Sequence, residues 1–195
     1  MTASEPRKDD KTLGRIRVLS VWLLVAALVA FSKPTPFSVF AGFAFVVVGE
    51  ALRCWAAGHL HKTVMLITSG PYRYTRNPLY LGRLLIFTGI TIMASLPYYG
   101  NWVVLILGYA IFFGYYLPRK ERVEPARLRE AHGPAYEAYF KAVPALFPSR
   151  TPWPDGSNDG WYSSRLRRNR EHWMLLAVIV ITWILMWRAY GGVRL

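Results

Sequence analysis

The chain has 195 residues, enough for one compact domain, and it is 53% hydrophobic with a formal net charge of +13. A basic chain can bind nucleic acid, but here the apolar residues lie in long uninterrupted blocks, which argues against that class and favours a membrane protein with basic water-facing segments. Cys54 is the only cysteine, so neither a disulfide framework nor a cysteine metal cluster is expected. The four histidines lack a zinc-binding spacing, and no metal site is predicted.

Five apolar blocks predict membrane spans, since a helix needs about 20 mostly apolar residues to cross a bilayer. In chain order they cover residues 18–31, 37–57, 79–96, 102–117 and 173–187. The predicted fold class is therefore all-α, a polytopic membrane helix bundle with short amphipathic cytoplasmic helices after the fourth span.

Lysine and arginine gather in the N-terminal arm, in the connection between the second and third spans, and in the stretch 119–170. The positive-inside rule places these segments in the cytoplasm and the N-terminus with them. A compact chain of this kind suits a prokaryotic inner membrane. The predicted organisation is a basic arm (1–17), a membrane core (18–148), a cytoplasmic loop (149–171) and an additional C-terminal transmembrane helix (172–195).

Two charged residues, Glu50 and Arg53, lie within the second apolar block, three positions apart and so on one helix face. One interpretation is a partly buried ion pair that stabilises the bundle. The other is a wall of the substrate cavity, because charges inside a membrane often mark such sites. The sequence leaves both open.

The segment 70–82 carries two glycines, two prolines, three tyrosines and two arginines between apolar blocks. Glycine and proline fix a turned backbone, and arginine at a membrane boundary needs a partner or water. The segment therefore predicts a binding site at the mouth of the bundle. A second polar segment, 119–140, has helical periodicity that Gly133-Pro134 should interrupt.

These two segments together resemble the isoprenylcysteine carboxyl methyltransferase and phospholipid methyltransferase superfamily, whose members are integral membrane enzymes that use S-adenosylmethionine. The first motif matches at Leu66, Ile67, Gly70, Pro71 and Tyr72, then at Arg76, Asn77, Pro78, Tyr80 and Gly82. The second matches at Glu124, Leu128, Gly133, Tyr136, Tyr139, Pro144 and Pro148. Only one glutamate of the family's pair is present, and Glu121 lies one helical turn before it as a substitute. The carboxyl methyltransferases usually have histidine at the position of Asn77. Asparagine at this position resembles the phospholipid enzymes instead.

The resemblance implies S-adenosyl-L-methionine as cofactor and a lipid or prenylated substrate that enters from the bilayer. No nucleic acid and no obligate protein partner are expected. Arg76 and Glu124 are the predicted catalytic residues, and Arg76, Arg53 and Glu50 are the predicted substrate-binding residues. The predicted cofactor-binding residues are Leu66, Ile67, Gly70, Tyr72, Asn77, Tyr80, Leu81, Gly82, Glu121 and Glu124.

Methyl transfer requires alignment of nucleophile, methyl group and leaving sulfur, and proximity can supply ~7–11 kcal/mol. A carboxylate acceptor is already ionised at neutral pH, whereas an ammonium acceptor needs a general base. The predicted function is isoprenylcysteine carboxyl O-methylation. Phospholipid N-methylation and a non-catalytic membrane protein with the same fold are the alternatives.

Overall fold

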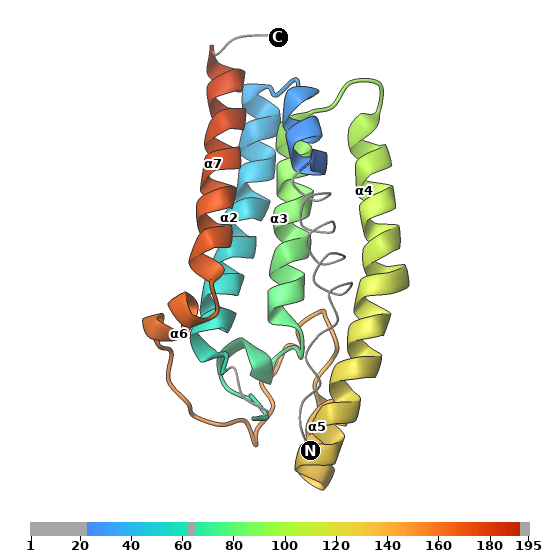
Figure 1. The fold of residues 1–195 in the computed structure, drawn as a ribbon, viewed down its shortest axis with the longest axis vertical. Helices are drawn as coiled ribbons and strands as arrows, with labels where there is room; N and C mark the ends of the chain where they lie inside the picture. Colours follow the sequence, from blue (N-terminus) through green and yellow to red (C-terminus); the bar gives the residue numbers. More distant parts are fainter. Residues whose placement is uncertain (1–22, 62–64, 192–195) are drawn as a thin grey trace, which may run out of the picture.

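The computed structural model describes residues 23–61 and 65–191 as a bundle of long helices (Figure 1). Residues 23–30 are helical and precede the first complete element. No strand occurs within the described ranges, and the all-α class is confirmed. The elements in chain order are α2 (Pro36–His59), the 3-10 helix η1 (Gly70–Arg73), α3 (Pro78–Ala94), α4 (Gly100–Ile111), the π-helix η2 (Phe112–Tyr116), α5 (Leu117–Ala142), α6 (Ser163–Arg168) and α7 (Glu171–Tyr190).

Three stretches are long and apolar enough to cross a membrane, and α3 is an apolar helix of 17 residues beside them. The three stretches are Pro36–His59, Gly100–Val123 and Glu171–Tyr190. The first predicted span, 18–31, lies partly outside the described residues, and the basic arm 1–17 lies wholly outside them. The membrane helix bundle is therefore confirmed, while the count of five spans stays a prediction.

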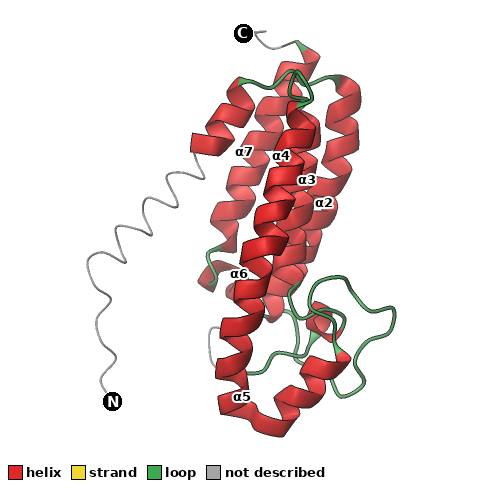
Figure 2. Ribbon diagram, turned by 90° about the vertical axis from the view of Figure 1, so that its right-hand side faces the viewer, coloured by secondary structure: helices red, strands yellow, loops and turns green. Residues whose placement is uncertain are grey.

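The fourth predicted span differs most from the structure. Its helix does not end at residue 117 but continues through η2 into α5, so that the first half of α5 extends the direction of α4 below the bundle (Figures 1 and 2). The chain then turns back at Gly133, whose φ of 49° and ψ of −122° interrupt the helix. This is the Gly-Pro pair at which the sequence predicts a break.

Local sequence accounts for the helix starts. Thr35 and Ser38 form a capping box, in which each side chain accepts a hydrogen bond from the other residue's backbone N–H, and Pro36 occupies the first turn of α2. Pro78 has the same place at the start of α3. Both helices therefore begin at prolines that the sequence places in the preceding turns.

Helices α2 and α3 lie unusually close because glycines face each other along their contact. Gly42 and Gly49 on α2 meet Gly89 and Gly82 on α3, seven residues apart on both helices. A Cβ added at Gly89 would lie 2.5 Å from the Gly42 carbonyl oxygen, and one at Gly82 would lie 2.7 Å from the Gly49 carbonyl oxygen. Small residues permit this approach, which favours helix association in a membrane.

Replacing Gly89 by Ala is expected to destabilise the protein by about 1–3 kcal/mol, because the new methyl group meets backbone that cannot move aside locally. Thermal unfolding in detergent measures the effect. Gly114→Ala is the matched control, since nothing lies within 4 Å of a Cβ at Gly114. Equal melting temperatures for both variants would contradict the close-packing argument.

The C-terminal helix α7 is joined to α2 by a buried ion cluster. Arg53 is 1% exposed and donates to Glu50 Oε1 at 2.8 Å and to Glu171 on α7. Its side chain runs against Gly82, where any larger residue would block the path. The cluster thus ties the last apolar helix to the α2–α3 pair.

Candidate functional site

A cavity of about 230 Å³ lies at the foot of the bundle, the end where η1 and α5 are found. Its walls come from the end of α2, the connection to η1, the first turns of α3 and both halves of α5. The lining residues are Leu60, His61, Met65, Leu66, Ile67, Tyr72, Arg76, Asn77, Pro78, Leu79, Tyr80, Arg83, Lys120, Glu121, Pro125, Leu128, Tyr136 and Tyr139. The two sequence motifs therefore meet at one cavity.

Glu121 on α5 is held by two consecutive residues from the start of α3. Asn77 Nδ2 donates to Glu121 Oε1 at 2.6 Å, and Arg76 forms an ion pair with Glu121 Oε2. Asn77 is buried and also donates to the Ala145 carbonyl at 2.8 Å. Both carboxylate oxygens of Glu121 thus have charged or amide donors, which fixes the carboxylate in the cavity wall.

Arg76 is held on several sides. Its guanidinium stacks on the Phe140 ring, 3.7 Å from the centroid, and donates to the Phe140 carbonyl as well as to Glu121. Its Nε is buried without a hydrogen-bond partner. Arg76 is thus a planar, permanently charged group fixed in the cavity wall, with one N–H donor unused.

Tyr72 and Tyr139 close the inner side of the cavity. The Tyr139 hydroxyl donates to the Tyr72 carbonyl at 2.9 Å, which joins η1 to the second half of α5. Burial raises the pKa of both phenols well above the ordinary value, so both stay protonated at neutral pH. As protonated phenols they are not bases, and they form part of the cavity wall.

The backbone of the first motif is held by the segment that follows α5. Arg76 N–H donates to the Pro144 carbonyl and Ser149 N–H to the Tyr74 carbonyl, each at 2.9 Å. Thr75 Oγ1 donates to the Leu146 carbonyl at 2.8 Å. The turned backbone that the prolines and glycines predict is thus fixed by contacts from residues about 70 positions later.

Seven predicted site residues line the cavity: Leu66, Ile67, Tyr72, Arg76, Asn77, Tyr80 and Glu121. Gly70, at φ 55°, packs against the His59 ring, and Leu81 lies in an apolar cluster with Leu84 and Leu146.

Gly82, Glu50 and Arg53 do not line the cavity but belong to the helix contact and ion cluster described above. For Glu50 and Arg53, the 2.8 Å ion pair supports the structural interpretation. Their absence from the cavity lining gives no support to the substrate-wall interpretation. The Glu124 side chain lies outside the described part of the structure, so its predicted role stays a prediction.

Comparison with known proteins finds one family model that is similar to part of this chain. The model of the phospholipid methyltransferase family matches residues 37–126. That family is part of the isoprenylcysteine carboxyl and phospholipid methyltransferase superfamily that the motifs resemble. The resemblance predicted from the motifs is thereby confirmed, and the family supports a membrane methyltransferase.

A curated relative, the cobalt-zinc-cadmium resistance protein CzcN of Cupriavidus metallidurans, is 29% identical over 178 residues, covering 86% of this chain and 79% of its own. No solved structure matches the chain. The matched methyltransferase region ends within α5, before the kink, so Leu128, Tyr136 and Tyr139 complete the cavity from outside it.

Sequence reasoning did not assign Arg83 and Lys120 to the site. Arg83 lies 5.5 Å and Lys120 5.2 Å from the centroid of the Tyr80 ring, and both line the cavity. Each is an ordinary basic residue near a span end, where the positive-inside rule explains it equally well. What marks Arg83 and Lys120 as site residues is that both lie near the Tyr80 ring, although they come from different helices, α3 and α5.

Proposed function

We propose that this protein is an integral membrane methyltransferase that uses S-adenosyl-L-methionine to methylate an acidic, lipophilic acceptor. The observation that carries the proposal is the convergence of both family motifs on one cavity at the foot of a membrane helix bundle. The cofactor supplies an electrophilic methyl group when bound. The residues of this chain bind and orient the two reactants.

The charges of the cavity fit the cofactor. The amino-acid end of S-adenosylmethionine carries a carboxylate and an ammonium group, which need a cation and an anion nearby. Arg83 and Lys120 supply cations beside Tyr80, and Glu121 supplies a carboxylate. The cavity is slightly smaller than the ~300–1,000 Å³ of typical ligand pockets.

The acceptor side is proposed at Arg76. Its planar guanidinium, with an unpartnered Nε, suits an acceptor carboxylate or phosphate. The cavity is also lined by three basic side chains, Arg76, Arg83 and Lys120, against one described carboxylate, Glu121. A carboxylate acceptor needs no base and fits this balance. An amine on a phospholipid is the second candidate, supported by the family model and by the pairing of Asn77 with Glu121.

The relative's name refers to metal resistance. Among the described residues, no group of three or more His, Cys, Asp or Glu side chains is placed to hold a metal ion. No observation favours a metal-binding function, and none is proposed.

Calorimetry with S-adenosylhomocysteine and the detergent-purified protein tests cofactor use. We expect micromolar binding, lost in Glu124→Ala and largely kept in Arg76→Ala if Arg76 serves the acceptor. Failure of folded wild-type protein to bind would contradict the proposed function.

The acceptor class is tested with methyl-labelled cofactor and two substrates, an S-prenylated cysteine and phosphatidylethanolamine in vesicles. Alkali releases label as methanol from a methyl ester but leaves an N-methyl group intact. Alkali-labile label is the expected result, and stable label on the phospholipid would establish the second candidate instead.

A further inference from the structure

The last turn of α2 ends directly at the cavity, and its carbonyls need partners because a helix leaves its final four carbonyls unbonded. Helix α2 ends at His59, and the next two residues, Leu60 and His61, line the cavity. Of these carbonyls, that of Gly58 accepts a hydrogen bond from Tyr162 N–H at 3.0 Å, and Trp161 Nε1 donates to the Cys54 carbonyl one turn earlier, also at 3.0 Å. The partners thus come from a segment about 100 residues later.

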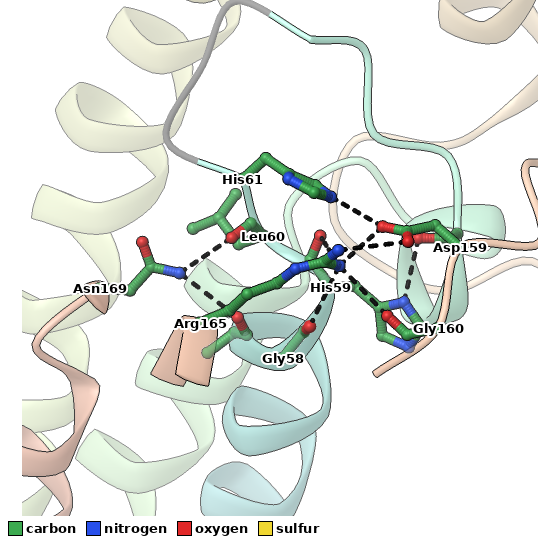
Figure 3. Close-up of polar contacts among 10 residues, drawn as sticks. Gly58, His59, Leu60, His61, Asp159, Gly160, Arg165 and Asn169 are labelled. Carbon is green, nitrogen blue, oxygen red and sulfur yellow. Dashed lines mark hydrogen bonds and ion pairs between the residues drawn. The ribbon is translucent and has the colours of Figure 1, made fainter. Parts of the chain in front are cut away.

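Four side chains complete this connection, and we call them the Asp159 clasp: His61, Asp159, Arg165 and Asn169 (Figure 3). Arg165 holds Asp159 with two hydrogen bonds, Nη1 to Oδ2 at 2.6 Å and Nη2 to Oδ1 at 3.2 Å. Arg165 Nη1 also points at the carbonyls of Gly58 and Gly160, at 3.4 and 3.1 Å.

Asn169 Nδ2 donates to the Leu60 carbonyl at 3.0 Å and to the Ala57 carbonyl at 3.3 Å. His61 Nε2 lies 2.8 Å from Asp159 Oδ2. Arg165, then His61, lowers the pKa of the Asp159 carboxyl well below its ordinary value, so Asp159 is ionised at neutral pH and His61 Nε2 is the donor. Both lining residues that follow α2 are therefore held by later residues, Leu60 by Asn169 and His61 by Asp159.

We propose that the Asp159 clasp is a positioning device, which holds Leu60 and His61 in the shape of the cavity wall that binds ligand. Asp159, Arg165 and Asn169 lie beyond the region matched by the methyltransferase family. None of these three residues is among those that line the cavity, so they are positioning residues. The expected effect on ligand binding rests on the proposed function. The claim that the clasp holds the cavity wall in place does not.

The clasp lies apart from the main packing of the bundle, since the α2–α3 glycine contact and the Arg53 cluster hold the helices independently. The side chains of Asp159 and His61 are 33% and 32% exposed. Breaking the clasp is therefore expected to loosen the wall without unfolding the bundle.

The test compares Asp159→Asn with wild type in two measurements, backbone hydrogen exchange in residues 54–61 and calorimetric binding of S-adenosylhomocysteine. We expect exchange in residues 57–61 to rise about tenfold and the Kd to rise about tenfold, with a melting temperature within about 4 °C of wild type. Asp159→Glu, which keeps a carboxylate, should recover part of both. Arg167→Gln changes an exposed residue of α6, the helix that carries Arg165, and should change neither.

Unchanged exchange in residues 57–61 of Asp159→Asn would overturn the proposal, and so would faster exchange with a Kd within twofold of wild type. If Asp159→Asn does not fold, Arg165→Lys keeps the charge but cannot form the two-bond pair, and the same criteria apply. If wild type does not bind the cofactor product, the proposed function fails, and the exchange result still decides whether the clasp holds the wall.

Discussion

Replacing Glu121 by Gln is expected to lower the rate of methyl transfer at least about 100-fold, because the reacting groups lose their fixed positions. At the cavity, both Arg76 and Asn77 donate hydrogen bonds to the Glu121 carboxylate. The amide cannot accept both donors equally and removes the charge that balances Arg76. Initial rates with labelled cofactor and acceptor measure the effect.

The matched control is Glu130→Gln, an exposed glutamate on the same helix, for which the rate should stay within twofold of wild type. The melting temperature of Glu121→Gln should fall by only a few degrees, since the residue is partly exposed and lies at the foot of the bundle. A rate for Glu121→Gln within threefold of wild type would show that the carboxylate has no part in the reaction.

Replacing Arg53 by Met is expected to destabilise the protein by about 3–5 kcal/mol, the usual cost of removing one partner from a buried ion pair. Glu50 and Glu171, whose side chains are only 12% and 13% exposed, would lose the guanidinium that both contact. The corresponding fall in melting temperature is about 10 °C. Thermal unfolding in detergent measures it.

Two comparisons separate this structural role from a role in substrate binding. Arg83→Gln should cost less than about 1 kcal/mol, because Arg83 is half-exposed and lies 3.9 Å from Glu171. For the folded fraction of Arg53→Met, KM for the acceptor should match wild type. A raised KM with an unchanged melting temperature would instead support the substrate-wall interpretation of Arg53 and Glu50.

Several parts of the fold follow from local sequence. Apolar runs predict helices α2, α3, α4 and α7, because a span needs nearly continuous apolar residues. The break at Gly133 follows from its own backbone freedom and the proline after it. The charges after residue 117 suggested separate helices beyond the fourth span, whereas the backbone continues helical through η2 into α5.

The candidate site is predictable only where a motif carries it. Arg76, Asn77 and Tyr80 lie in one contiguous motif, so a single turn of chain brings them to the cavity. Lys120 and Arg83 belong to no such motif. Their approach to Tyr80 depends on how α5 is placed against α3, which no local pattern encodes.

The sequence by itself determined the membrane helices, the turned segment between α2 and α3, and the resemblance to the methyltransferase superfamily, because apolar length, proline and glycine act within a few residues. The tertiary structure alone decided the partners of the charges. Glu121 pairs with Arg76 across 45 residues, His61 with Asp159 across 98, and Arg53 with Glu171 across 118. A charge near or inside a membrane must find a partner, but which one it finds depends on helix rotation and register, and those are set by packing over the whole bundle.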